Sequence, residues 1–248
     1  MNLSGKTAFI TGSASGIGKA TLIAFAEAGA HVIGADIDAE KGAAVVQELQ
    51  AQKRSAEFTQ IDLSKSELIR ACAAAVIEKH PKIDILVNTA GYSMIEPFQA
   101  NKPSYIDLVV AINLGGVIHL SQALLPALIA AGKSKVVNVA SDAGRVGSSG
   151  ETAYAAAKGG VIAFTKSLAR EVARHQICVN CVCPGPTDTP MLRTRPEKLL
   201  DAFLKAIPFK RFAEPREIAD AILFFASPNS DYVTAQVLSV SGGLTFAG

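Results

Sequence analysis

Residues 7–18 read TAFITGSASGIG, an apolar strand that runs directly into a glycine-rich turn and the start of a helix. Such a turn lets backbone N–H groups at a helix N-terminus approach a pyrophosphate, as in the parallel α/β folds that bind dinucleotides. The turn alone is also compatible with a plain strand-to-helix connection. Its G-x-x-x-G-x-G spacing departs from the G-x-G-x-x-G pattern, and a Walker loop is excluded because residue 13 is serine.

Apolar strands and helical segments alternate outward from this turn. The predicted strands are residues 7–11, 31–36, 56–61, 84–88, 135–140, 177–183 and 236–240, and the predicted helices are residues 17–28, 39–53, 65–80, 104–131, 151–175 and 215–226. Near-continuous apolar strands separated by helices are typical of a parallel sheet that helices cover on both faces. The sequence therefore predicts an α/β fold.

No low-complexity linker or internal repeat divides the 248 residues, so we predict a single domain, residues 1–248. Hydrophobic residues make up 49% and charged residues 19% of the chain, which suits a sizeable core and argues against disorder. One segment, about residues 186–214, is long, proline-bearing and basic. We predict that it covers the substrate and call it the flap.

Charge and targeting signals narrow the class of protein further. The formal net charge of +2, without a basic block, gives no support for a nucleic-acid partner. The N-terminus lacks the basic and apolar regions of a signal peptide, which predicts a cytoplasmic protein. Residues 109–132 are uncharged and long enough to span a membrane, but they include Asn113, Ser121 and Pro126. Such a run is more typical of a helix buried in protein, so no membrane contact is expected.

Three of the four cysteines form a C-x-x-C-x-C cluster at residues 178–183, which invites a metal interpretation. The run also reads as a buried strand, in which cysteine behaves as a small hydrophobe and Cys178 and Cys181 point to opposite faces. Only His175 is nearby as a fourth ligand. We expect no metal site and no disulfide here.

A carboxylate ends the second predicted strand at Asp36. An acid at this position can accept both ribose hydroxyls of an adenosine, and it would repel a 2′-phosphate. No arginine or lysine stands beside it or at Ser15, so the sequence favours NAD over NADP. The alternative is that Asp36 only caps the turn before Ala39.

Three residues form a candidate reactive group. Tyr154 and Lys158 are four residues apart on a predicted helix, so they share one face. A lysine ammonium and a positive nicotinamide ring would favour the phenolate and lower the pKa of the tyrosine. Ser141 follows the fifth strand, at the sheet edge where ligands bind, and its hydroxyl could hold a substrate oxygen. Taken singly, these residues also fit a solvent-facing helix pair and a turn-capping serine.

Together the motifs resemble the short-chain dehydrogenase/reductase family along essentially the whole chain. The matching segments are the turn at residues 11–18, Asn88-Thr89-Ala90-Gly91, Ser141 with Tyr154-x-x-x-Lys158, and Pro184-Gly185-x-x-x-Thr189. The resemblance implies a Rossmann-type doubly wound sheet of about seven parallel strands in the order 3-2-1-4-5-6-7. Thr89 stands where the family usually has asparagine, which puts the local loop bonding in question.

The resemblance also implies the residues of the site. Asn113 would join Ser141, Tyr154 and Lys158 as a fourth catalytic residue that holds a proton-relay water. The predicted cofactor residues are Gly12, Ser15, Gly16, Ile17, Gly18, Asp36, Ile37, Asp62, Leu63, Asn88, Ala90, Gly91, Tyr154, Lys158, Pro184, Gly185, Thr187 and Thr189. The predicted substrate residues are Ser93, Met94, Ser141, Val146, Tyr154, Met191 and Leu192.

These residues predict an NAD-dependent oxidoreductase in which Tyr154 removes the alcohol proton, Ser141 binds the oxygen and Lys158 supports the phenolate. The largely apolar candidate pocket favours a hydrophobic secondary alcohol. Residues 141–150, 183–189 and 237–245 resemble members of the family that oxidise cyclohexanol, 1-arylethanols or 2-hydroxycyclohexanecarboxyl-CoA. We therefore expect a free cyclic or aryl-substituted secondary alcohol as substrate, in the degradation of aromatic or alicyclic compounds.

Three alternatives stay open. In an alicyclic 2-hydroxyacyl-CoA dehydrogenase, Arg193, Arg195 and Lys198 would meet a CoA phosphate rather than form a solvated face. A 3-oxoacyl-carrier-protein reductase shares the motifs, but it usually prefers NADP and would need a basic patch for its carrier. A non-catalytic NAD-binding regulator need not keep the reactive residues. A Ser-His-Asp hydrolase is disfavoured because no G-x-S-x-G occurs and the four histidines are scattered.

The oligomeric state is expected only by analogy with the family. Similar enzymes are mostly homotetramers that pair their long fourth and fifth helices. The uncharged run at residues 109–132 would supply such a buried interface.

Overall fold

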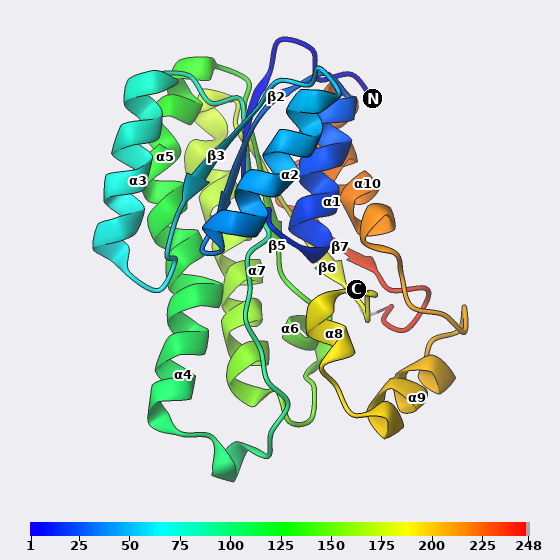
Figure 1. Cartoon of the computed structure of the whole chain (residues 1–248). Helices are drawn as coiled ribbons and strands as arrows, with labels where there is room; N and C mark the ends of the chain where they lie inside the picture. Colours follow the sequence, from blue (N-terminus) through cyan, green and yellow to red (C-terminus); the bar gives the residue numbers. More distant parts are fainter. Residues whose placement is uncertain (247–248) are drawn as a thin grey trace.

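A seven-stranded parallel sheet forms the centre of the protein, and the computed structural model describes residues 1–246 (Figure 1). The strands are β1 (Thr7–Thr11), β2 (His31–Asp36), β3 (Ala56–Gln60), β4 (Ile85–Asn88), β5 (Lys135–Val139), β6 (Cys178–Pro184) and β7 (Val237–Val240). Their order, β3-β2-β1-β4-β5-β6-β7, confirms the predicted doubly wound topology. Because the order reverses between β1 and β4, their carboxyl ends leave a crevice, which is where such sheets bind ligands.

The strands in the middle of the sheet are buried along their whole length. β4, β5 and β6 expose none of their residues. Valine and isoleucine suit this environment because their branched side chains favour extended backbone. The polar residues are paired inside the protein, since Asn88 Nδ2 donates to Asn138 Oδ1 at 2.8 Å and Asn138 Nδ2 donates to Thr165 Oγ1 at 2.9 Å. A one-residue slip of a strand would leave these buried amides unpaired.

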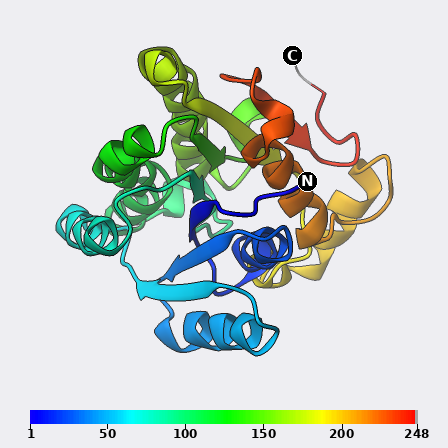
Figure 2. The ribbon, with the colours of Figure 1, turned by 90° about the horizontal axis from the view of Figure 1, so that it is seen from above.

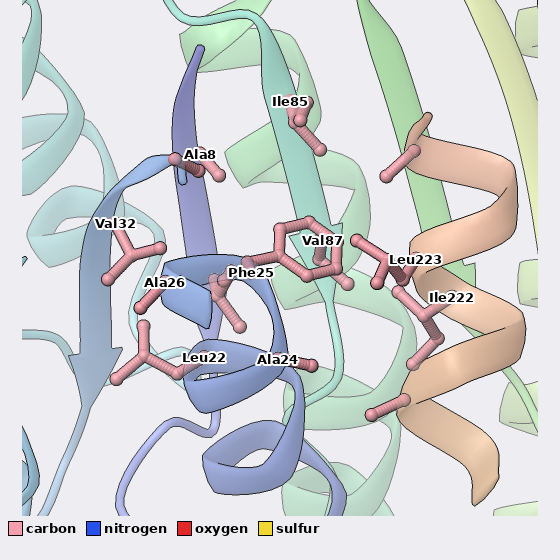
Figure 3. Packing of buried hydrophobic residues seen from close by; sticks show 14 of the residues in the cluster. Ala8, Leu22, Ala24, Phe25, Ala26, Val32, Ile85, Val87, Ile222 and Leu223 are labelled. Atoms are coloured by element: carbon pink, nitrogen blue, oxygen red, sulfur yellow. The ribbon is translucent and has the colours of Figure 1, made fainter. Parts of the chain in front are cut away.

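Two layers of helices enclose the sheet (Figure 2). One layer contains α1 (Gly16–Glu27), α2 (Ala39–Ala51) and α10 (Pro215–Ala226), and the other contains α3 (Ser66–Lys79), α5 (Gly116–Ala131) and α7 (Thr152–Val172). Phe25 of α1 faces Val87 of β4, with Ile222 and Leu223 of α10 close by (Figure 3). Phe25 is completely buried. Burial of a side chain of this size stabilises the fold by about 2 kcal/mol.

The helix predicted over residues 104–131 is interrupted. It consists of α4 (Pro103–Val110), a π-helical turn η2 (Ala111–Gly115) and α5. The combined segment of 29 residues is long and apolar enough to cross a membrane, by length and composition alone. However, Leu120, Leu124 and Leu128 are buried against the sheet. Packing in the core therefore accounts for part of its apolar character.

Two helices occupy the flap, where no regular structure was predicted. α8 (Pro190–Arg193) and α9 (Glu197–Ala206) bury none of their residues. The Thr189 hydroxyl caps α8 by accepting from Leu192 N at 3.3 Å, and Pro190 occupies a first-turn position that tolerates proline. The remaining short helices are α6 (Ala143–Val146) and the 3₁₀ turns η1 (Phe98–Ala100), η3 (Ala173–His175) and η4 (Pro228–Ser230). The other predicted strands and helices are confirmed, with small shifts at their ends.

The cysteines of β6 pack as small apolar side chains. The Sγ atoms of Cys181 and Cys183 lie 4.0 Å apart on one side of the strand, and Cys178 Sγ lies 3.5 Å from Lys135 Nζ. All four cysteines of the chain are free thiols. This packing is the one predicted for a buried strand.

Candidate active site

A cleft of about 820 Å³ lies at the carboxyl ends of the strands, between the N-terminus of α1 and the flap. It brings together most of the residues predicted from the sequence. Those that line it are Gly12, Ser15, Gly16, Ile17, Gly18, Asp36, Ile37, Asp62, Leu63, Ala90, Gly91, Ser141, Val146, Tyr154, Lys158, Pro184, Gly185, Thr187, Thr189, Met191 and Leu192. The predicted residues outside the lining are Asn88, Ser93, Met94 and Asn113.

The glycine turn at the start of α1 fits an anionic group. A Cβ on Gly18 would lie 2.0 Å from the Gly12 carbonyl oxygen, and a Cβ on Gly12 would lie 2.9 Å from Ala90 Cα, so side chains would not fit there. Ser15 provides no side-chain cap to α1, and the first turn of the helix holds no acidic residue. The first N–H groups of α1 can therefore bind the pyrophosphate of a dinucleotide.

Two carboxylates line the cleft beyond the ends of β2 and β3. Asp36 accepts from Ala14 N at 2.9 Å and from Asp38 N at 3.0 Å, which fixes it beside the glycine turn. Asp62 accepts from Ser64 Oγ at 2.6 Å and from Ser64 N at 2.9 Å. The Ser64 hydroxyl holds the pKa of Asp62 below its usual range, so this residue is ionised at neutral pH. Both carboxylates can accept hydrogen bonds from the adenosine part of a dinucleotide.

The loop after β4 is tied to β1 by threonines. Thr89 N donates to Thr11 Oγ1 at 3.1 Å, the Thr89 hydroxyl donates to the Thr11 carbonyl, and Ala90 N donates to Thr11 Oγ1 at 3.2 Å. Thr89 therefore makes its own bonds at the position where the resemblance led us to expect asparagine. Asn88 is buried and bonded inside the sheet, so it supports the cleft from behind.

Tyr154, Ser141 and Lys158 lie together on the floor of the cleft. Lys158 Nζ lies 5.8 Å from the centroid of the Tyr154 ring and donates to the Val139 carbonyl at 2.8 Å. Ser141 follows β5, and its Oγ accepts from Ala143 N at 3.1 Å. A carbonyl or alcohol oxygen that enters the cleft can thus meet two hydroxyl groups, with a lysine ammonium behind the phenol.

Burial controls the protonation of both groups on α7. Burial raises the pKa of Tyr154 above its usual value, the Glu151 carboxylate adds to the rise, and the Ser141 hydroxyl opposes it. Burial also lowers the pKa of Lys158 to about 8. The sequence led us to expect that lysine would favour the phenolate, but desolvation outweighs the charges of the chain itself. Tyr154 is therefore a protonated phenol at neutral pH.

Asn113 lies behind the floor of the cleft, in η2. It is completely buried, and its Nδ2 donates to the carbonyl oxygens of Tyr92 at 2.8 Å and Val109 at 2.9 Å. Its Oδ1 accepts from Tyr92 N at 3.2 Å. A Cβ on Gly91 would lie 2.9 Å from Asn113 Oδ1 and 3.5 Å from Lys158 Nζ, so glycine allows this close approach. The side chain of Asn113 thus positions the loop after β4, and its role in holding a relay water stays a prediction.

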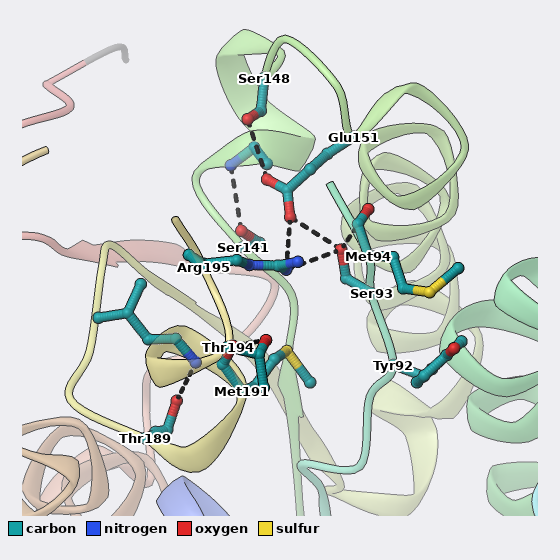
Figure 4. A network of polar contacts seen from close by, with 12 residues as sticks. Tyr92, Ser93, Met94, Ser141, Ser148, Glu151, Thr189, Met191, Thr194 and Arg195 are labelled. Carbon is teal, nitrogen blue, oxygen red and sulfur yellow. Dashed lines mark hydrogen bonds and ion pairs between the residues drawn. The ribbon is translucent and has the colours of Figure 1, made fainter. Parts of the chain in front are cut away.

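A buried ion pair that the sequence analysis missed joins the flap to the body of the protein (Figure 4). Arg195 Nη2 donates to Glu151 Oε1 at 3.2 Å and to Ser93 Oγ at 3.3 Å. Ser93 and Ser148 donate to the two carboxylate oxygens of Glu151 at 2.8 Å and 2.9 Å. The Arg195 and Glu151 side chains are only 8% and 13% exposed. We call this group the Arg195–Glu151 clamp.

The position of the clamp changes what was expected of its members. Arg195 was considered as a partner for a CoA phosphate or as part of a solvated face; it pairs with Glu151, and both residues line the cleft. Ser93 was predicted to touch substrate, yet its hydroxyl is bonded within the clamp. Glu151 stands three residues before Tyr154, so the two share one helix face, and this spacing was the available signal.

The outer wall of the cleft is apolar. It is formed by Ile95, Leu108, Ile112, Val146, Met191, Leu192, Phe203 and Leu244. Met94, predicted as part of this wall, instead lies outside the lining with 41% of its surface exposed. A wall of this kind suits a hydrophobic substituent beside the reacting carbon.

Comparisons with known proteins agree with this geometry. The profile described as enoyl-(acyl carrier protein) reductase matches residues 12–245. The chain belongs to the short-chain dehydrogenase/reductase family. The crystal structure of gox2181 resembles it with a TM-score of 0.95 and 30% sequence identity, over 98% of this chain and 96% of that chain.

The curated relatives carry names from acyl-thioester chemistry. The 3-oxoacyl-[acyl-carrier-protein] reductase FabG of Thermotoga maritima is 41% identical over 98% of this chain and 99% of the relative. The enzyme of the same name from Chlamydia pneumoniae is 38% identical over 99% of both chains. The (2S)-[(R)-hydroxy(phenyl)methyl]succinyl-CoA dehydrogenase subunit BbsD of Thauera aromatica is 39% identical over 100% of both chains.

The protein is therefore an oxidoreductase that acts on CH–OH groups and uses a nicotinamide cofactor. This conclusion sets aside the alternative of a non-catalytic regulator. It also corrects the finer resemblance expected from the sequence, because these relatives are named for carrier-protein and CoA thioesters rather than for cyclohexanol or 1-arylethanols. Short motifs around the reactive residues do not separate these substrate groups.

Proposed function

We propose that the protein interconverts 3-oxoacyl and 3-hydroxyacyl thioesters with NAD(H). Full-length similarity to 3-oxoacyl-[acyl-carrier-protein] reductases carries this proposal, and the similarity to a CoA-thioester dehydrogenase subunit supports it. The apolar outer wall of the cleft suits the acyl chain. The free cyclic or aryl-substituted secondary alcohol expected from the sequence thereby becomes the less supported substrate.

The residues on the floor of the cleft would handle the proton. In reduction, Ser141 and Tyr154 donate hydrogen bonds to the substrate carbonyl oxygen, and the phenol then passes its proton to that oxygen. Because burial raises the pKa of Tyr154, the phenol is in the protonated form that reduction needs. In oxidation Tyr154 must first lose its proton, and the Lys158 ammonium stabilises the phenolate that then accepts the alcohol proton. A bound nicotinamide supplies hydride transfer to or from the carbon.

The preference for NAD(H) rests on Asp36. Its carboxylate is fixed at the end of β2, where it would accept the ribose hydroxyls and repel a 2′-phosphate. The nearby Lys41 is bonded to Asp38 at 2.8 Å rather than directed to the cleft. The predicted cofactor residues at the glycine turn, Asp62, Leu63, Thr187 and Thr189 would hold the rest of the dinucleotide.

A homotetramer remains part of the proposal by analogy with the family. Val110, Ile118 and Ile129 of the α4–α5 segment are each more than a third exposed, and they form apolar surface that association would cover. Sedimentation equilibrium of the purified chain tests this, and a monomer at micromolar concentration would refute it.

The decisive experiment compares three substrate groups with each nicotinamide. Acetoacetyl-CoA, a 3-oxoacyl carrier protein and the free ketones cyclohexanone and acetophenone are each offered with NADH and with NADPH, and absorbance of the reduced nicotinamide is followed. We expect kcat/KM for a thioester to exceed that for either ketone by at least about 100-fold. We expect NADH to be preferred to NADPH by at least about tenfold, since a 2′-phosphate would face the Asp36 carboxylate.

Each part of the proposal has its own negative outcome. Preference for a free ketone would restore the secondary-alcohol interpretation. Preference for NADPH would overturn the argument from Asp36 and leave the substrate class intact. Comparison of kcat/KM for acetoacetyl-CoA and for the 3-oxoacyl carrier protein decides which of the two thioesters the enzyme prefers.

A further inference from the structure

Three residues that are far apart in the sequence meet at the amino-terminal edge of the sheet, on the opposite side from the cleft. His31 is the first residue of β2, Glu57 lies in β3, and His80 directly follows α3. The parallel strands begin at this edge, whereas the cleft lies at their carboxyl ends. Figure 1 shows the end of α3 at the top of the molecule and the flap helices at the bottom. The cluster is therefore separate from the active site.

The three side chains direct potential metal ligands at one small volume. Glu57 Oε1 lies 3.2 Å from His31 Nε2 and 3.3 Å from His80 Nε2. All the potential ligand atoms lie within 4.8 Å of one another, and the two imidazole rings have centroids 5.1 Å apart. Two ligands of a tetrahedral zinc ion, each about 2.1 Å from the metal, are separated by about 3.4 Å. The two distances from Glu57 Oε1 to the imidazole nitrogens are close to this ligand-to-ligand separation.

Both imidazole nitrogens lack a partner. His31 Nε2 and His80 Nε2 are shielded from solvent, and neither makes a hydrogen bond within the described residues. Each lies within ion-pair distance of Glu57 Oε1, a contact that is strong only when the imidazole is protonated. Buried polar atoms without partners are uncommon in folded proteins. A cation held between the three side chains would satisfy both nitrogens and the carboxylate oxygen together.

The surroundings are those of a metal-binding histidine and carboxylate. His31 Nδ1 lies 2.7 Å from Ser55 Oγ, and metal-binding histidines usually fix their second nitrogen by such a bond. Lys79 Nζ is bonded to Glu57 Oε2, which leaves Oε1 as the single ligand oxygen. The Lys79 side chain is 65% exposed, so water screens part of its charge, and the remaining charge opposes a bound cation.

We propose that His31, Glu57 and His80 bind a divalent transition-metal ion, with Zn²⁺ as the best match to two imidazoles and one carboxylate. Nε2 of each histidine and Oε1 of Glu57 are the protein ligands, and water completes the tetrahedron. The ion joins β2, β3 and the end of α3, so it stabilises the fold at a distance from the cleft. The alternative is an ion-pair cluster in which Glu57 is shared by protonated histidines and Lys79.

Zinc binding to the whole, untagged and metal-free chain tests the proposal. Isothermal titration calorimetry with ZnCl₂ should show one site per chain, and thermal unfolding should shift upward with zinc. Affinity should fall by at least about tenfold in His80→Gln and in Glu57→Gln. The matched control His175→Gln removes a histidine elsewhere and should bind as the unmodified protein does. No binding to the unmodified chain, or undiminished binding to both ligand variants, overturns the proposal.

A third variant keeps all three ligands and separates the two interpretations. Lys79→Gln removes a positive charge beside the proposed ion, so zinc should bind several-fold more tightly. If the residues form only an ion-pair cluster, this variant gains no affinity for zinc. Unchanged or weaker binding therefore contradicts the proposal. This variant changes an exposed side chain and should fold normally, so the proposal can be tested even if the ligand variants misfold.

Cobalt(II) in place of zinc identifies the ligand atoms. The free cysteines are the competing ligands in this chain. Cobalt bound by thiolates absorbs strongly through sulfur-to-metal charge transfer, whereas cobalt bound by imidazole and carboxylate does not. Weak visible absorption that disappears in His80→Gln supports the site, and an intense charge-transfer band would assign binding to cysteine and overturn it.

Discussion

The two walls of the cleft are held in place by different means. The wall proposed to hold the cofactor consists of the glycine turn, β1, β2 and β4, and its shape depends on backbone packing. At Gly18 a single added carbon would lie 2.0 Å from a backbone oxygen. The opposite wall is the flap, whose helices α8 and α9 bury no residues and which the Arg195–Glu151 clamp attaches to the body of the protein.

This difference shows which part of the site can change most easily. A wall made of close backbone contacts admits few substitutions, because each one disturbs strands that are buried on both faces. A wall attached by a few polar side chains can accept new residues while the sheet stays intact. The wall proposed to hold the cofactor and the flap wall should therefore differ in their tolerance to mutation. Four predictions follow, and the second and third compare the two walls directly.

The largest effect is expected on the floor, which both walls share. Tyr154→Phe removes the hydroxyl that exchanges a proton with substrate, so kcat should fall by about 10³-fold. Affinity for NADH, measured by fluorescence titration, should change by less than about twofold because the phenyl ring keeps its packing. Substantial remaining turnover in this variant would remove Tyr154 from the mechanism.

The next largest effect concerns the wall of the glycine turn. In Gly18→Ala the new methyl group would collide with the Gly12 backbone, so we expect NADH affinity to fall by about 100-fold or more. Gly147→Ala is the matched control on the substrate side, because Gly147 has a φ of +83° and open space around its Cβ position. It should cost about 1–3 kcal/mol of stability and leave NADH affinity unchanged. Equal effects of the two substitutions on cofactor binding would break the contrast between the walls.

The flap provides a pair of arginines for a direct comparison. Arg195→Gln removes the charge partner of Glu151, which keeps only its bonds to Ser93 and Ser148, so stability should fall by about 1–3 kcal/mol and KM for the thioester should rise about tenfold. Arg193 is bonded to Asp188 at the surface, with its side chain 72% exposed, so Arg193→Gln should change KM by less than about twofold. Urea unfolding and steady-state kinetics measure both variants. A similar KM for the two would show that the clamp does not hold the flap.

The smallest effect is a dependence of stability on pH that comes from Lys158. Its folded pKa of about 8 lies below the usual value of 10.5, so between these values the unfolded chain binds more protons. The contribution of Lys158 to the free energy of unfolding therefore increases with pH in that window, by on the order of 1 kcal/mol per pH unit. Urea unfolding of the protein and of Lys158→Met from pH 7.5 to 10 should give curves that diverge. Parallel curves would mean that Lys158 keeps its ordinary pKa.

The sheet and the glycine turn could be predicted because they depend on local patterns. The apolar strands at residues 7–11 and 135–139 are continuous, and the turn between β1 and α1 carries its glycines at the positions where side chains would collide. The position of Asp36 beside that turn follows from the parallel arrangement of β1 and β2. Each of these signals lies within a few residues or within one strand pair.

The parts that escaped prediction depend on contacts over long distances in the sequence. The clamp joins residues 44 positions apart, and no local sequence pattern around Glu151 or Arg195 indicates that the two residues pair. The histidines looked scattered because β2 and the end of α3 meet only after folding. Asn88 was predicted at the cofactor, but its side chain lies on the face of the sheet that α5 covers, where it bonds to Asn138 and Ser121. The flap, which was predicted to cover the substrate, is the segment where the sequence has the weakest regularity.

The π-helical turn η2 holds one residue more than an α-helical turn would. A deletion of one codon there would restore a regular helix and leave α4 and α5 in nearly the same phase, so Val109 would stay beside Tyr105 and Leu120 would stay on the sheet. The change would be confined to the turn itself, which carries Asn113. A single codon therefore sets the local geometry of Asn113 without altering the packing of the two flanking helices.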